Sequence, residues 1–316
     1  MPLHVPVDRV GSSEAMGCNL RDLANPESIN LRDLSNKRVA IDTFLVAYQF
    51  ITSIRARGEG QDGGPLRDSK GRPISHLMGF LDRATVMIEN GIDPILQLTV
   101  RDRNRLALQG DLVGASALGV NNILCLGGDD PKNGDQPETK IVNDIDSLTL
   151  VSTANMMRKE QKLPSGRKLE PPPKLFIGGA EVPTQGKPNP DKILNKISNG
   201  VDFFQTQYVF DPKILNEYMK ILGDNGILDK TNFIIGIGPF ASAKSAKWMN
   251  ENLFGVDVPD QIIKRLEGSE DPKEESKKIC LELIESYRNI NGVKGVHLMG
   301  HKKELVISEI IKESKK

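Results

Sequence analysis

The sequence predicts an α/β fold of the (β/α)₈ TIM-barrel type that is incomplete or irregular at its N-terminal strands. Short, almost continuously apolar segments alternate with segments of helical period along the 316-residue chain. Strands of this kind are typical of a parallel sheet that is covered on both faces. Seven such strands can be counted, one fewer than a closed barrel of this class needs. Leu3–Val7 is a candidate for the eighth.

The predicted strands are runs of four to eight mainly apolar residues, each bounded by polar residues, glycine or proline. In chain order they are Arg38–Thr43, Pro94–Thr99, Asn122–Gly127, Lys174–Gly179, Phe203–Tyr208, Asn232–Ile237 and Gly295–Met299.

Helices are predicted between these strands where apolar residues recur at intervals of three and four. The predicted helices include a face formed by Leu77, Leu81, Ala84 and Ile88, and the segments Arg105–Leu118 and Ile145–Lys159.

Two further helix starts are marked by an aspartate directly before a proline. Asp211 precedes Pro212, and Asp271 precedes Pro272. A carboxylate at this position caps free backbone amides, and proline suits the first helical position.

Composition bounds the possible functions. Lys plus Arg number 42 and Asp plus Glu number 42, which argues against a nucleic-acid or anionic-membrane partner. No apolar run approaches the roughly 20 residues that cross a bilayer. Cys18, Cys125 and Cys280 lack the paired spacing of a zinc site, and Cys125 is expected to be a packing residue. We expect a cytoplasmic protein with no metal.

The most informative segment is Gly127–Pro131, Gly-Gly-Asp-Asp-Pro, which follows a predicted strand. Its glycines let a ligand approach the backbone, and Asp129 places a negative charge beside that ligand. The same segment is also a common turn. Two further motifs stand at strand ends, Leu98–Arg105 and Phe204–Asp211. Ligand chemistry in a barrel collects at these carboxyl ends.

These three motifs, in this order, resemble those of the flavin-dependent methylenetetrahydrofolate reductases over roughly residues 90–316. The resemblance implies bound FAD and NAD(P)H as electron donor, although some relatives use a partner protein. It also implies reduction of 5,10-methylenetetrahydrofolate to 5-methyltetrahydrofolate, in one-carbon metabolism and methionine biosynthesis, with a reduced folate as the partner.

Asp129 and Gln207 are the catalytic residues that the resemblance implies. A carboxylate beside the flavin and the folate stabilises developing positive charge. The Gln207 amide offers a donor and an acceptor to a pterin edge. Gln205 lies on the same strand face, so one of the two glutamines could instead belong to a polar layer of the barrel core.

Five residues are implied as ligand contacts, and each has an ordinary alternative. Thr99 and Gly128 would contact the flavin, or be a strand residue and a turn glycine. Asp146 would face the cofactor, or be a helix N-cap. Lys196 would bind the cofactor phosphates, or be a solvated helix residue. Lys303 would replace an arginine that grips the folate tail.

The chain also departs from the reductase pattern. Gln97 stands where the family often has histidine, Gly127 where it has arginine, and Gly179 in a region where it has an aromatic residue. The first strand of the family, with the glutamate that is its proposed general acid, has no counterpart here, and neither does the flavin contact of its second strand. Asp42 is a conceivable stand-in acid. Loss of a general acid costs on the order of 10²–10⁴ in rate.

Residues 16–91 resemble the opening of an archaeal or eukaryotic flap endonuclease instead. The matching segments are Met16–Leu23, Lys37–Asp42, Tyr48–Phe50, Pro65–Arg72 and Ser75–Leu77. The predicted organisation is therefore an unassigned leader over 1–15, a nuclease-like fragment over 16–91 and a reductase-like barrel over 92–316.

The nuclease-like fragment carries little of the nuclease chemistry. Asp42 matches the first metal-binding carboxylate of that family, and one carboxylate cannot hold a pair of Mg²⁺ ions. Arg72 resembles a DNA-backbone contact, which alone gives weak, salt-sensitive binding.

Three functions stay open from the sequence. The first is the flavin-dependent reductase, the second is a catalytically inactive barrel fusion, and the third is a nucleic-acid-binding remnant of a structure-specific 5′ nuclease. An open barrel edge would favour a homo-oligomer.

Overall fold

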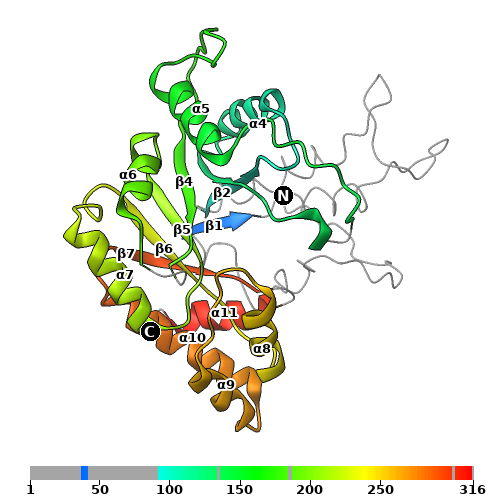
Figure 1. Ribbon diagram of the computed structural model, residues 1–316, viewed down its shortest axis with the longest axis vertical. Helices are drawn as coiled ribbons and strands as arrows, with labels where there is room; N and C mark the ends of the chain where they lie inside the picture. Colours follow the sequence, from blue (N-terminus) through cyan, green and yellow to red (C-terminus); the bar gives the residue numbers. More distant parts are fainter. Residues whose placement is uncertain (1–36, 42–91, 134–135, 184–186, 301–302, 315–316) are drawn as a thin grey trace, which may run out of the picture.

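The computed structural model describes residues 37–41, 92–133, 136–183, 187–300 and 303–314 (Figure 1). Seven parallel strands form one sheet in these residues, and their order in the sheet is their order in the chain. The strands are β1 (Lys37–Ile41), β2 (Ile92–Thr99), β3 (Asn122–Leu126), β4 (Phe176–Glu181), β5 (Phe203–Tyr208), β6 (Asn232–Ile237) and β7 (Val293–Leu298).

All seven predicted strands are confirmed, and two of them, β5 and β6, have the predicted bounds. Every neighbouring pair is parallel, from Lys37 opposite Ile92 in β1–β2 to Ile237 opposite Leu298 in β6–β7. Sequential parallel order is the topology of a (β/α) barrel. Within the described residues no ladder joins β7 to β1, so the sheet is a curled, incomplete barrel, as predicted. Leu3–Val7 and the helix face of Leu77 to Ile88 lie outside the described residues.

Helices alternate with the strands and cover the outer face of the sheet (Figure 1). They are α4 (Arg105–Ala117), the 3₁₀ turn η2 (Pro131–Asn133), α5 (Ser147–Lys159), α6 (Pro190–Ser198), α7 (Pro212–Asp224), α8 (Ala243–Asn252), α9 (Asp260–Glu267), α10 (Pro272–Arg288) and α11 (Glu304–Glu313).

The two Asp-Pro helix starts are confirmed. Asp211 accepts a 2.8 Å hydrogen bond from the Lys213 amide at the start of α7. Asp271 accepts from the Lys273 and Glu274 amides at the start of α10, at 3.0 and 3.2 Å. Each carboxylate satisfies amides that have no partner within the helix.

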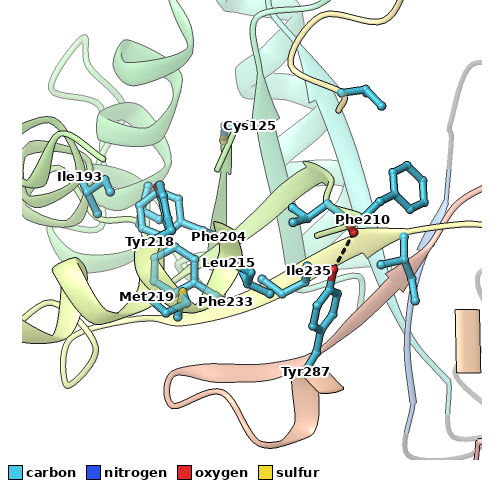
Figure 2. Close-up of a cluster of buried hydrophobic side chains, with 14 of the residues drawn as sticks. Cys125, Ile193, Phe204, Phe210, Leu215, Tyr218, Met219, Phe233, Ile235 and Tyr287 are labelled. Atoms are coloured by element: carbon cyan, nitrogen blue, oxygen red, sulfur yellow. Dashed lines mark hydrogen bonds between the residues drawn. The ribbon is translucent and has the colours of Figure 1, made fainter. Parts of the chain in front are cut away.

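The main core lies between the sheet and the helices. Phe204 and Phe233 stack with ring centroids 5.1 Å apart, and Tyr218 and Ile193 lie beside them (Figure 2). The hydroxyl of Tyr287 on α10 donates a 2.8 Å hydrogen bond to the Val209 carbonyl oxygen, which ties that helix to the end of β5.

Cys125 also faces this core and is 2% exposed. Burial raises the pKa of its thiol to about 12, so the thiol stays protonated, and its predicted packing role is confirmed.

A second, smaller apolar cluster fills the inside of the curled sheet. It consists of Ile95, Leu124 and Phe203, with Leu126, Phe176 and Ile234 packed against them. Gly178 makes room for this layer, because a Cβ atom at that position would lie 2.4 Å from the Phe203 ring. The inner face therefore has an apolar floor.

None of the helices that the structure describes is long and apolar enough to span a bilayer. The described ranges also contain no group of three or more His, Cys, Asp or Glu side chains that could hold a metal ion.

Candidate functional site

On the inner face of the sheet, polar side chains lie beyond the apolar cluster, nearer the carboxyl ends of the strands. Ile95 and Phe203 belong to the inner cluster, so strand alternation places Thr99 on the inner face of β2 and Gln205 on that of β5. Gln207 follows near the carboxyl end of β5, where the β5–β6 register is irregular between Gln205 and Tyr208. Gln205 is 7% exposed, whereas Gln207 is half-buried. Of the two glutamines, Gln205 is thus the one in the polar layer of the barrel core. Gln207 lies at the open, carboxyl end of the strands.

The ends of β2 and β3 are joined by one arginine. Arg101 pairs with Asp102 through two nitrogens, at 2.6 and 2.9 Å. Its Nη1 donates a 2.7 Å hydrogen bond to the backbone carbonyl oxygen of Asp129. Asp102 also accepts from the Thr99 hydroxyl, at 3.2 Å. We call these four residues the Arg101 cluster.

Within the Arg101 cluster, the positive charge of Arg101 is paired with the negative charge of Asp102. The hydrogen bond to Arg101 holds the pKa of Asp102 below its usual value. The hydrogen bond to Asp102 raises the pKa of Arg101, with smaller contributions from the charges of Asp129 and Asp130. The pair stays ionised at neutral pH, and the Asp129 backbone is held in place.

Gly128 is required by the backbone of this loop. Its φ is +89°, and an added Cβ atom would lie 2.9 Å from Arg101 Cβ and 3.5 Å from Thr99 Cβ. An L side chain is strained at this φ. Gly128 therefore lets the loop pack directly on the end of β2, which places Thr99, Gly128 and Asp129 together.

Asp129 itself is exposed to solvent. Its neighbour Asp130 has a local role, since it accepts a 3.0 Å hydrogen bond from the Lys132 amide in η2.

Gln207 bridges β5 to the segment after α8. Its Oε1 accepts a 2.9 Å hydrogen bond from the Tyr208 amide, and its Nε2 donates a 3.3 Å bond to the Phe254 carbonyl oxygen. The Phe254 side chain is 76% exposed. Asp129 follows β3 and Gln207 lies in β5, so one strand, β4, separates them in the sheet.

Lys196 on α6 is engaged at the end of β4. Its Nζ lies 2.7 Å from the Ala180 carbonyl oxygen and 2.9 Å from Glu181 Oε2, and it stands 5.6 Å from the centroid of the Phe204 ring. Lys196 is therefore a half-buried, paired cation in this structure and not a freely solvated one.

Asp146 and Lys303 mark the starts of two helices. Asp146 is the N-cap of α5, accepting a 2.7 Å hydrogen bond from the Thr149 amide, and this bond lowers its pKa. Lys303 precedes α11, and burial, followed by the charge of Lys273, lowers its pKa. The N-cap alternative for Asp146 is thus realised in the structure.

The sequence alone predicts no separate roles for the residues of the Arg101–Arg105 run after β2. Arg101 and Asp102 organise the site, and the usable signal was a charge pair at a strand end. Asp42 and Arg72 lie outside the described residues. Gln97 is on the inner face, whereas an added Cβ at Gly179 would contact Val201 and Phe204 on the outer side.

Comparison with solved structures finds distant neighbours. An uncharacterized protein from Clostridium thermocellum, described as binding two copies of 5-methyl-5,6,7,8-tetrahydrofolic acid, has 16% sequence identity and a TM-score of 0.46, over 90% of this chain and 96% of its own. A family 51 α-L-arabinofuranosidase from Bifidobacterium longum has 12% identity and a TM-score of 0.46, over 85% of this chain and 60% of its own.

Among curated proteins, flap endonuclease 1 of Methanobrevibacter smithii is 46% identical over 80 residues, which is 25% of this chain and 23% of the relative. The enzyme of Methanococcoides burtonii is 48% identical over 80 residues, 25% of this chain and 22% of the relative. The chain thus spans less than a quarter of the length of these relatives.

Family models match both parts of the chain. The XPG N-terminal domain matches residues 18–104, and methylenetetrahydrofolate reductase matches residues 82–315, which is 234 of the 316 residues. The predicted union of two families is confirmed. The chain belongs to the methylenetetrahydrofolate reductase family and carries an N-terminal segment of the XPG N-terminal type.

Proposed function

We propose that this chain is a flavin-dependent oxidoreductase that reduces 5,10-methylenetetrahydrofolate to 5-methyltetrahydrofolate, with FAD as cofactor and NAD(P)H as electron donor. The observation that carries the proposal is the Arg101 cluster. It fixes the backbone of an exposed aspartate, Asp129, at the carboxyl end of an inner strand, in a chain of this family.

The residues present fit a planar conjugated ring. Phe203 and Leu124 give the inner face an apolar floor, and Thr99 and Gln207 stand above it with a hydroxyl and an amide. Binding sites for such ligands are mostly apolar, with a few polar groups that fix orientation. Because Gly128 has no side chain, a ligand could also approach the main chain of its loop.

Lys196 would face the cofactor phosphates. In this structure it is paired with Glu181, so phosphate binding requires the Nζ group to exchange a carboxylate partner for a phosphate partner. Asp146 would act through its N-cap, by setting the direction of α5.

When bound, the reduced flavin supplies the hydride. The Asp129 carboxylate stabilises the positive charge that develops as the folate ring opens to an iminium ion. The Gln207 amide orients the pterin edge, for which its Nε2 must leave the long 3.3 Å bond to Phe254. Lys303 would attract the negatively charged folate tail.

A general acid in place of the family's glutamate is the missing element. Asp42, the sequence candidate, lies outside the described residues. We propose that solvent supplies the proton, at a rate lower by about 10²–10⁴ than a positioned acid provides.

The purified full-length chain tests this proposal through its visible spectrum and its activity. A flavin spectrum, present on purification or after addition of FAD, together with NAD(P)H-dependent formation of 5-methyltetrahydrofolate, is expected. A protein that takes up FAD but forms no product supports the inactive fusion. A protein that takes up no FAD refutes the reductase.

The XPG-type match is the one observation that favours a nucleic-acid function. Retention on a DNA column at moderate salt, lost in the Asp42→Asn and Arg72→Ala variants, would support it. The balanced net charge of the chain argues for no retention.

A further inference from the structure

The inner face of β7 carries a histidine that the site described above does not use. Gly295 lies opposite Ile234 and His297 lies opposite Gly236 in the β6–β7 ladder. Ile234 packs against the inner apolar cluster. Since residues in register share a face of a parallel sheet, Gly295 and His297 also face inward.

The imidazole of His297 is unsatisfied. Its Nδ1 atom is buried and has no hydrogen-bond partner among the residues that the structure describes. Most buried polar side-chain atoms are hydrogen-bonded, and each exception asks for a physical reason. Burial lowers the pKa of His297 to about 4, so at neutral pH the ring is uncharged, with one nitrogen as donor and the other as acceptor.

Two described inner neighbours of His297, Gly295 and Gly236, carry no side chain that could act as a hydrogen-bond partner. A Cβ atom added at Gly295 would meet nothing within 4 Å, so the space beside it is open. On the other side, Met299 Cε would lie 2.7 Å from an added Cβ at Gly236, which places a thioether over that glycine. The described surroundings thus include a thioether beside Gly236 and an open space beside Gly295.

His297 stands at about the height of Gln207. Gly236 lies opposite His297 on one side and opposite Tyr208 on the other, and Tyr208 directly follows Gln207. Gly236 therefore lies between the strand position of the imidazole and that of Tyr208, the residue after Gln207. The two neutral polar groups thus stand at the same, carboxyl end of the sheet.

We propose that His297 is a ligand-contacting residue, whose Nδ1 forms a hydrogen bond with the polar edge of a conjugated nitrogen heterocycle bound inside the curled sheet. The inference rests on the proposed function and adds one residue that would contact its ligand. A neutral imidazole flanked by apolar groups suits an uncharged ring edge, whereas a phosphate or carboxylate would call for a cation. The edge could come from the flavin or from the pterin of the folate.

The experiment measures two dissociation constants for the full-length protein, one for FAD and one for 5-methyltetrahydrofolate on the FAD-loaded protein. The variants are His297→Leu, which removes both nitrogens, and His297→Asn, whose amide group lies near the position of Nδ1. Lys294→Ala, an exposed residue of the same strand, is the matched control. Thermal unfolding of each ligand-free protein is recorded in parallel.

We expect His297→Leu to weaken one of the two ligands by about 3- to 10-fold, the usual range for one hydrogen bond. His297→Asn should stay within about twofold of the wild type, and Lys294→Ala should be unchanged. Weaker FAD binding assigns the flavin edge, and weaker folate binding assigns the pterin edge. The ligand-free His297→Leu protein should unfold at the same or a higher temperature, because it loses an unsatisfied buried atom.

Two results would overturn the inference. One is unchanged affinity for both ligands in His297→Leu, which refutes the contact and leaves the proposed function standing. The other is a lower unfolding temperature of ligand-free His297→Leu, which assigns the imidazole a structural role. A wild-type protein that binds neither ligand overturns the proposed function and this inference together.

Discussion

Arg101 Nη1 lies 2.7 Å from the backbone carbonyl oxygen of Asp129, and this hydrogen bond ties the end of β2 to the loop after β3. The other nitrogens of the guanidinium grip Asp102. One side chain thus sets the position of the loop that carries the candidate catalytic carboxylate, while the carboxylate itself stays exposed.

Arg101→Lys should impair catalysis more than stability. Lysine keeps the charge but cannot reach Asp102 and the Asp129 carbonyl with one planar fork. We expect kcat/KM to fall about 10-fold, since small displacements of reacting groups are costly. Arg105→Lys is the matched control, because Arg105 makes a similar two-pronged pair with Asp144 away from the loop. Equal losses in both variants would contradict a special role for Arg101.

Asp129→Asn should remove the charge that stabilises the transition state. We expect kcat to fall by about 10²–10³, with an unchanged free energy of unfolding because Asp129 is exposed. Asp130→Asn keeps an oxygen that accepts the Lys132 amide hydrogen bond, removes only the charge, and should keep nearly full activity. Steady-state kinetics and urea unfolding of both variants test this prediction. A larger loss of kcat in Asp130→Asn than in Asp129→Asn would contradict a catalytic role for Asp129.

Gly128→Ala should strain the loop. The φ of +89° and the 2.9 Å approach to Arg101 together should cost about 1–2 kcal/mol in the free energy of unfolding. They should also weaken FAD binding. Gly127→Ala provides the comparison, because its added Cβ meets nothing within 4 Å, and we expect a change under about 1 kcal/mol. Urea unfolding measures both, and indistinguishable values would show that the loop adapts.

His297 predicts an acid dependence of stability. Burial lowers its pKa from 6.5 to about 4 in the folded protein. Between these values the unfolded chain binds a proton that the folded chain does not, so stability falls as the pH is lowered from 6.5 toward 4. His297→Leu removes this contribution. The difference between wild type and variant should therefore change steadily across that window and level off below it. A constant difference from pH 7 to pH 4, by urea unfolding, would contradict a buried neutral imidazole.

The ion pair of Arg158 and Asp202 should be a stability determinant distant from catalysis. Arg158 binds Asp202 at 2.5 Å and donates to the Leu175 and Gly200 carbonyl oxygens, and Asp202 also accepts from the Ile177 amide. Asp202→Asn leaves a half-buried guanidinium underpaired, so we expect a loss of about 1–3 kcal/mol. The kcat of the folded fraction should be unchanged, and a variant as stable as wild type would refute this.

The strands were predictable because their signal is local. A short apolar run such as Asn232–Ile237 needs only its own residues to be identified, and its bounds are those observed. The Asp-Pro caps of α7 and α10 were predictable for the same reason. The side-chain contacts were not, because the Arg101 bond to Asp129 spans 28 positions and depends on how two strand ends meet.

The site residues also divide into those whose contacts are local in the sequence and those whose contacts join distant positions. Asp146 reads as an N-cap from three neighbouring positions, and the structure shows that cap. Lys196 reads as a solvated or phosphate-binding residue, yet it is paired with Glu181, 15 positions away on β4. His297 is not among the site residues predicted from the sequence. Its place on the inner face follows from the register of β6 and β7, which the sequence does not state.

The first strand of the sheet, β1, matches only the nuclease-type model, and it hydrogen-bonds in register to β2, which lies where the two family matches overlap. The hydrogen bonds between main-chain amides and carbonyls depend on the direction and spacing of the two strands. They do not depend on the family from which each strand comes. A parallel ladder is therefore a junction at which unrelated genes can be joined, provided that the incoming segment arrives extended, points the same way and is covered on both sides.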